Sequence, residues 1–246
     1  FVPSRGLGDV YKRQDMNKHL LVSAMALALT ACGSTAIMDK SAAVKAQPEL
    51  NIKTDNNLWK LGREGTFDIA GMYKGKYSRS ASSSTWFNKL SFKDGEMAAE
   101  VTRNSDGKTW VLTCTGGGVS YNYMGVEFGG NDPYICTISS DEKSVGEYKI
   151  EPDAGVLDIG FDKTEKGLVR IGTTHFNVKT IHTGEGLLVP VDTPLGYSFE
   201  RGTQEVAAVQ TNGALTIQML DSLNDDERDT LVVGAIASAL GWRPEE

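Results

Sequence analysis

Residues 231–240 have the sequence LVVGAIASAL, and no side chain among them carries a charge. A helix that is apolar on every side must be buried on every side, so this segment predicts a helix inside the fold. It is too short to cross a bilayer, which takes about 20 residues. A helix lying in a membrane interface is the alternative, but that position requires a strongly polar face, which is absent here. Gly234 and its alanine neighbours keep the helix narrow enough for a tight enclosure.

Both ends of this helix carry recognisable signals. Asn224 followed by Glu227 has the spacing of a capping box, in which each side chain bonds the backbone of the other residue. Gly241 is a typical C-terminal stop, and Pro244 prevents the helix from continuing. We therefore expect a helix over residues 225–240. Burying its five large apolar side chains contributes about 8–15 kcal/mol as an upper bound.

The chain before this helix alternates between apolar and polar residues in short runs. From Thr66 onward these runs are separated by Gly, Asn or Asp about every ten residues, which is typical of antiparallel strands. Ser105-Asp106-Gly107 and Thr211-Asn212-Gly213 stand where hairpins need left-handed residues. The expected fold class is mainly β, an antiparallel β-barrel (or sandwich) of about 10–14 short strands enclosing or packing the hydrophobic C-terminal helix.

The final part of the chain resembles a known superfamily. Residues 196–199 (GYSF), 206–209 (VAAV) and 215–217 (LTI), followed by an acidic turn and the apolar helix, are similar to the tubby C-terminal superfamily, which includes LURP-one-related proteins and phospholipid scramblases. The resemblance implies a closed, roughly twelve-stranded antiparallel barrel around a C-terminal helix. The basic residues with which tubby proteins bind phosphoinositides have no counterpart here, nor has the calcium segment of scramblases. The resemblance therefore implies a fold and not an activity.

The chain near residue 30 has the pattern of a signal peptide. Lys18 precedes an apolar run that ends in Leu29-Thr30-Ala31, and Cys32 follows. Residues 16–31 resemble a bacterial lipoprotein signal, with Leu29, Thr30 and Ala31 as the signal-peptidase recognition residues. The resemblance implies that Cys32 becomes the N-terminus, carries acyl chains such as palmitate and anchors the protein to a membrane. Gly33 in the next position suggests the outer membrane, with the domain facing the periplasm. An ordinary secretory signal with a chance cysteine is the alternative.

The rest of the chain divides by composition. We interpret residues 1–15 as a non-native segment, because Asp9 to Gln14 resembles translated adapter sequence fused upstream of the gene. Residues 32–57 are rich in Ala, Lys, Ser and Asn and are predicted to form a flexible tether. Residues 58–246 are then the β-rich periplasmic domain.

Cysteine usage and charge narrow the classes of function. With Cys32 assigned to lipid, Cys114 and Cys136 remain as a pair in an oxidising compartment, which favours a disulfide between them. Metal ligation is the alternative, but two isolated cysteines make a poor zinc site. The formal net charge of -7 argues against nucleic acid as a partner and against adhesion to anionic lipid. Covalent acylation must then supply the membrane attachment.

The sequence offers little for catalysis, and we expect no cofactor and no metal. His175 and His182 are an odd number of residues apart on an extended segment, so we expect one to face inward and the other solvent. Asp158, Asp162 and Glu165 lack the alternating spacing of a calcium loop, which favours a solvated hairpin end.

The best candidate binding surface is aromatic. Tyr121, Tyr123, Phe128 and Tyr134 lie around a Gly-Gly-Asn-Asp segment between the two cysteines, and aromatic rings on a constrained loop suit sugar or peptide binding. Rings that face the core are the alternative. The function expected from the sequence is a lipid-anchored envelope lipoprotein with a non-catalytic binding or structural role toward an envelope protein, peptidoglycan or lipid. A lipid-handling protein and an envelope hydrolase are the alternatives.

Overall fold

The structure, a computed structural model, describes residues 36–55, 64–79, 97–116, 133–153 and 164–241, and the backbone of residues 121–123 and 126–128. Twelve of the described strands form a closed barrel. In chain order these strands are β1 (Leu50–Thr54), β2 (Glu64–Ile69), β3 (Tyr73–Ser78), β4 (Met97–Arg103), β5 (Thr109–Thr115), β8 (Tyr134–Ser140), β9 (Lys143–Pro152), β10 (Glu165–Ile171), β11 (Thr174–Ile181), β12 (Gly196–Arg201), β13 (Gln204–Gln210) and β14 (Thr216–Met219). The other elements are β6 (Tyr121–Tyr123), β7 (Val126–Phe128), α2 (Ala42–Lys45) and α3 (Asp225–Gly241).

The barrel has a simple up-and-down topology. Each strand pairs antiparallel with the next one along the barrel sequence, and β14 closes the sheet on β1, where Leu50 lies opposite Ile217. Closure leaves no strand edge with unpaired backbone groups, which is the general advantage of a barrel over an open sheet. The expected fold class is confirmed, and of the two architectures left open by the sequence it is the barrel that forms.

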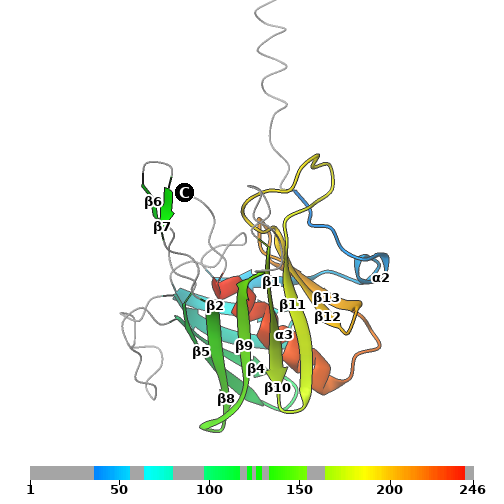
Figure 1. The fold of residues 1–246 in the computed structure, drawn as a ribbon. Helices are drawn as coiled ribbons and strands as arrows, with labels where there is room; N and C mark the ends of the chain where they lie inside the picture. The colour runs from blue at the N-terminus through cyan, green and yellow to red at the C-terminus, as the bar shows by residue number, and fades with distance from the viewer. Residues whose placement is uncertain are drawn as a thin grey trace, which may run out of the picture. The chain divides into compact units, whose positions relative to one another are not determined.

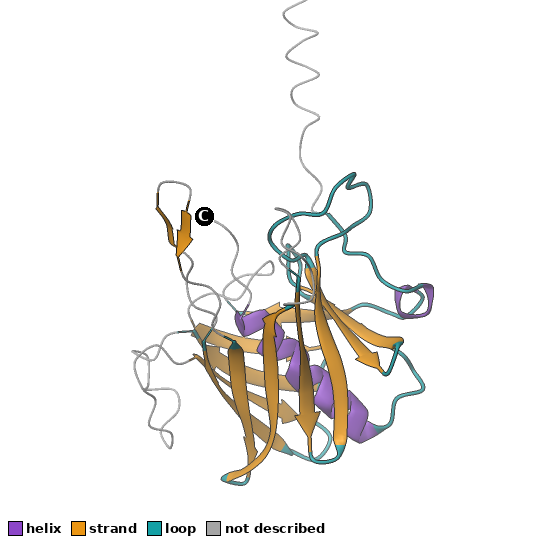
Figure 2. Ribbon diagram, viewed as in Figure 1, coloured by secondary structure: helices purple, strands orange, loops and turns teal. Residues whose placement is uncertain are grey.

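Helix α3 runs through the interior of the barrel, where strands surround it (Figures 1 and 2). Every residue from Asp229 to Leu240 is buried, as the absence of a polar face predicts. The capping box is also present, because the Asn224 side chain accepts from Glu227 N at 3.0 Å and the Glu227 carboxylate accepts from Asn224 N at 3.0 Å. A Cβ on Gly234 would lie 2.9 Å from the ring of Phe199, so the enclosure is tight at this point.

None of the described helices combines the length and the apolar character that crossing a bilayer requires.

The two ends of the barrel differ in the length of their connections. At one end, which we call the turn end, β2–β3, β4–β5, β8–β9, β10–β11 and β12–β13 are joined by two to five residues. Gly107 in the Ser105-Asp106-Gly107 turn has φ 77°, as its turn signal predicts. At the opposite end, which we call the loop end, five to eighteen residues join consecutive barrel strands. Residues placed at the loop end can therefore vary without disturbing the strand register.

The N-terminal part of α3 is held at the turn end by a buried carboxylate, that of Asp229. Asp229 accepts from the Tyr73 hydroxyl at 2.8 Å and from Arg103 Nη1 at 2.9 Å, and Lys108 Nζ lies 3.8 Å away. Burial raises the pKa of Asp229, while Tyr73, Arg103 and Lys108 oppose that rise. Arg103 also forms a bidentate pair with Asp106, which holds the pKa of Asp106 well below its ordinary value. No sequence motif pointed to this network.

Residues 36–49, which we call the strap, cross the outer face of β13 and β14. Met38 and Val44 of the strap pack with Leu195 and Ala208 in a second small core outside the barrel. Polar contacts reinforce the strap, since Gln218 Nε2 donates to Gln47 O at 2.6 Å. This covering explains why β13 and β14 are buried on both faces.

The predicted flexible tether over residues 32–57 is therefore wrong for residues 36–55. These residues form the strap and β1, and β1 pairs with both β2 and β14. The compact unit begins at Ala36 and not at residue 58. The predicted segments 1–15 and 16–31 lie outside the described residues.

The position of α3 can be tested by charging its centre. Ile236 is fully buried, and an Ile236→Asp variant would place a carboxylate without a partner in the barrel interior. Burying an unpaired charge costs several kcal/mol, which is comparable with the whole stability of a domain. We expect the variant to lose its cooperative unfolding transition in far-UV circular dichroism. Ile236→Val is the matched control, with an expected loss of about 1 kcal/mol. An unchanged melting curve for Ile236→Asp would mean that the helix is external.

Candidate functional site

The loop end brings together four polar side chains on the inner side of the barrel wall. In β11 the even-numbered side chains from Phe176 to Thr180 are buried, and His182 continues this alternation just beyond the strand. Thr180 is the register partner of Tyr197 on β12, and Glu165 begins the neighbouring strand β10. We call Glu165, Thr180, His182 and Tyr197 the mouth cluster.

His182 is held on both sides of its ring. Its Nδ1 lies 2.7 Å from Val191 O, and its Nε2 lies 3.0 Å from Thr180 Oγ1. Because a carbonyl only accepts, we assign the proton to Nδ1, which leaves Nε2 to accept from the Thr180 hydroxyl. Val191 N donates in turn to His182 O at 2.9 Å. This arrangement, which we call the His182 latch, closes the base of the connection between β11 and β12.

The latch does not have the composition of a nucleophilic site. A hydroxyl next to an imidazole is part of such a site, but the group that orients the ring is here a backbone carbonyl and not a carboxylate. Thr180 is also buried, and its hydroxyl already accepts from Glu165 N at 2.9 Å. His175 is exposed on the outer face of β11, so the predicted opposite orientation of the two histidines is confirmed. The described residues thus bring no catalytic triad together at the mouth.

Glu165 differs from its predicted environment. It was expected at a solvated hairpin end, but it is half-buried on the inner side of β10, the same side as the buried Val169. Burial raises the pKa of Glu165. Burial also raises the pKa of Tyr197, and the carboxylate of Glu165 adds to that rise. Asp158 and Asp162, the other members of the predicted acidic group, lie outside the described residues. Within the described part of the chain no three His, Cys, Asp or Glu residues are grouped as metal ligands.

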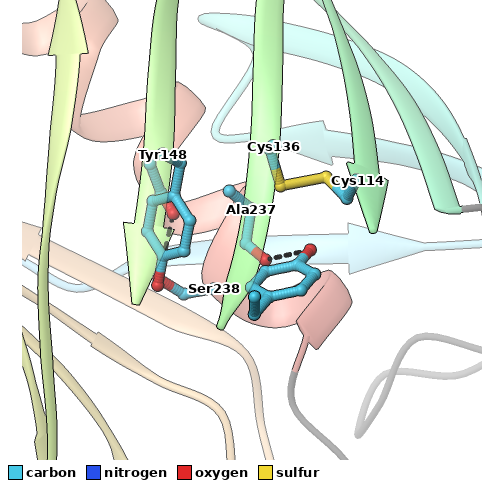
Figure 3. The surroundings of a disulfide bond; sticks show 7 residues. Cys114, Cys136, Tyr148, Ala237 and Ser238 are labelled. Carbon is cyan, nitrogen blue, oxygen red and sulfur yellow. Dashed lines mark hydrogen bonds between the residues drawn. A yellow bond between two sulfur atoms is a disulfide. The ribbon is translucent and has the colours of Figure 1, made fainter. Parts of the chain in front are cut away.

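Two tyrosines inside the barrel form hydrogen bonds with the C-terminal part of α3. The Tyr134 hydroxyl donates to Ala237 O at 3.0 Å, and the hydroxyls of Tyr148 and Ser238 are 2.9 Å apart (Figure 3). The Ser238 hydroxyl donates to Gly234 O at 3.0 Å, so Tyr148 is the donor to Ser238. Burial raises the pKa of Tyr148.

The prediction that Tyr134 belongs to an aromatic binding surface is wrong. Tyr134 is 5% exposed and meets Tyr148 edge to face with ring centroids 5.9 Å apart, so it belongs to the core. Its position at the start of β8, where the inward alternation of that strand begins, is the signal that would have placed it there.

The other three members lie on a separate hairpin. Strands β6 and β7 form a two-stranded sheet inside the connection between β5 and β8, and their backbone register pairs Tyr121 with Phe128 and Tyr123 with Val126. The side chains of Tyr121, Tyr123 and Phe128 lie outside the described residues, so a binding role for them stays a prediction.

The predicted disulfide is present at the base of this connection. Cys114 on β5 and Cys136 on β8 are register partners with Cα atoms 3.9 Å apart, and they are joined by a disulfide (Figure 3). Both cysteines are fully buried next to the helix. The bridge closes a loop of 22 residues around the β6–β7 hairpin, which stabilises the fold by about 3 kcal/mol in the chain-entropy model.

The environment of Glu165 predicts a pH-dependent stability. Because its pKa is raised, the folded protein keeps this proton to a higher pH than the unfolded chain does. Its contribution to the free energy of unfolding is therefore greatest below the ordinary carboxyl pKa and falls as the pH rises through the window up to the raised pKa. We compare the free energies of unfolding of Glu165→Gln and the wild type in urea at two pH values, about pH 4 and about pH 8. We expect the difference, variant minus wild type, to be more favourable to the variant at the higher pH. Glu142→Gln, in the exposed β8–β9 turn, is the control, and an equal difference for Glu165→Gln at both pH values would contradict the prediction.

Comparison of the chain with known protein families, with curated proteins and with solved structures finds no match.

Proposed function

We propose that the chain is a lipid-anchored lipoprotein of the cell envelope, whose barrel has a non-catalytic binding or structural role and presents the loop end to its partner. The observation that carries the binding role is the filled interior of the barrel. Residues 229–240 of α3 are buried among the inward-facing side chains of the strands. A ligand must then bind on the outer surface and not in a lumen.

The loop end is the part of the outer surface best suited to this role. Its connections are long, whereas those of the turn end contain two to five residues. Binding residues are commonly carried by loops that a rigid scaffold positions. The β6–β7 hairpin lies within one of these connections, is not paired with the barrel and has the disulfide at its base.

The two alternatives have less support. A lipid-handling role for a scramblase-like protein calls for an interior that can accept an acyl chain, and here α3 fills that space. A hydrolase calls for an accessible nucleophile, and the one hydroxyl in contact with a histidine among the described residues, that of Thr180, is buried.

The lipid anchor depends on the thiol of Cys32. In the proposed lipoprotein the lipid that carries the acyl chains is attached through this thiol, so we expect Cys32→Ser to abolish metabolic labelling with an azido-palmitate and to release the domain from the membrane fraction. Ser34→Ala, two residues further on, is the matched control and should be labelled like the wild type. Unchanged labelling of Cys32→Ser would end the lipoprotein proposal.

The binding role can be tested by photocrosslinking in the native envelope. A benzoylphenylalanine at position 121 or 128, within the hairpin, is expected to give a discrete adduct with a protein, glycan or lipid. The same residue at position 173, in the exposed β10–β11 turn at the turn end, is the control and should give none. The same adducts from all three positions, or none from any, would contradict a binding surface at the loop end.

A further inference from the structure

The connection between β11 and β12 carries an exposed apolar tip. Leu187 is 36% exposed, Leu188 is 101% exposed and Val189 is 70% exposed. A run of three consecutive exposed apolar residues is uncommon on a soluble protein unless the surface is used for contact. We call residues 187–189 the apolar tip.

Hydrogen bonds fix the backbone on both sides of the apolar tip, and we call this hydrogen-bonded part of the connection the base. The His182 latch closes one side of the connection. On the other side, residues 183–185 pair with residues 37–39 of the strap, with Asp39 N donating to Thr183 O at 3.0 Å and Glu185 N donating to Ile37 O at 2.9 Å. Leu187 N donates to Gly184 O at 3.1 Å and starts the turn that carries the tip. The base therefore holds the three apolar side chains away from the core, where packing would otherwise have covered them.

The same base places the tip next to the first described residues of the chain. Ile37, which is 47% exposed, belongs to the segment that pairs with this connection. Cys32 precedes Ala36 by four residues, and four extended residues reach at most about 14 Å. If Cys32 is acylated, the membrane surface that its acyl chain enters lies within about 14 Å of Ala36, which begins the strap segment that supports the tip.

We propose that the apolar tip and Ile37 insert into the surface of the bilayer that holds acylated Cys32, so that the barrel sits with its loop end toward the membrane. This inference rests on the proposed lipid anchor. Two or three acyl chains would fix the protein to a bilayer but leave the domain free to rotate, whereas a second apolar contact selects one orientation.

The charges near the tip indicate that the contact is apolar and not electrostatic. Glu185 is paired with Lys45, and the exposed Asp192 follows the tip. The described residues that flank the tip, 182–195, include no lysine or arginine that could attract anionic lipid. Insertion should therefore be insensitive to ionic strength and should occur with zwitterionic lipid.

Two proteins that each carry a single free thiol test this orientation. Cys114 and Cys136 are joined and Cys32 is acylated, so Leu188→Cys adds one reactive thiol at the tip, and Thr203→Cys adds one in the exposed β12–β13 turn at the turn end. Each acylated full-length protein is labelled with NBD and reconstituted into phosphatidylcholine vesicles that contain a doxyl-labelled lipid. We expect NBD at position 188 to be quenched several-fold more than NBD at position 203, equally at low and high salt. Adding Leu187→Asp and Val189→Asp to the position-188 protein should bring its quenching down to the level of position 203.

The outcomes separate this inference from the proposed function. Proteins that float with the vesicles but show equal quenching at both positions overturn the inference and leave the anchor intact. Failure of the acylated chain to attach to vesicles overturns the proposed function and this inference together. A blue shift at position 188 that appears without vesicles and grows with protein concentration would mean that a second copy of the chain covers the tip, which also overturns the inference.

Discussion

The fold depends on the burial of one helix that has no polar side. In α3 the residues from Leu231 to Leu240 are all buried, so the strands have to surround the helix completely and not merely cover one face of it. A closed barrel meets this requirement, and its interior is narrow enough that Gly234 lies directly against Phe199 and Val169. The helix and the barrel are thus each unable to exist without the other. An empty twelve-stranded barrel would contain a large apolar cavity, and an isolated α3 would expose its whole surface to water.

Apolar contacts alone give a helix inside a barrel little preference for one rotation about its own axis. A few polar contacts fix that rotation. Asp229 meets Tyr73 and Arg103 at the turn end, while Ala237 O and Ser238 meet Tyr134 and Tyr148 at the loop end. A rotation or slide of the helix by one residue would leave these buried groups without partners, at a cost of about 1–3 kcal/mol for each neutral group. The polar contacts therefore fix the register of the helix, and apolar burial supplies most of its stability.

The sequence predicts those features that have a local residue pattern. It does not predict the environment of a residue whose neighbours are distant in the chain. The α3 helix, its Asn224–Glu227 cap and the Cys114–Cys136 pair are visible as local patterns. Strand β1 is not, because only Ile52 of its five residues is buried and polar residues flank it. The strap is equally inconspicuous, since the outer face of β13 against which it packs lies more than 150 residues away in sequence. The inward position of Glu165 depends on which face of β10 meets α3, which no local pattern specifies.

The strap is the first described part of the chain and links the two ends of the barrel. It runs along the outside of the barrel from the loop end to the start of β1 at the turn end, and its first residues pair with the β11–β12 connection. In the proposed lipoprotein, an anchor at Cys32 would hold the domain from the loop end, through the pairing of residues 37–39 with residues 183–185. The latch formed by His182 and Val191 supports this pairing from the opposite side. In the proposed function the loop end would serve both attachment and recognition, while the turn end holds the N-terminal part of the helix through Asp229.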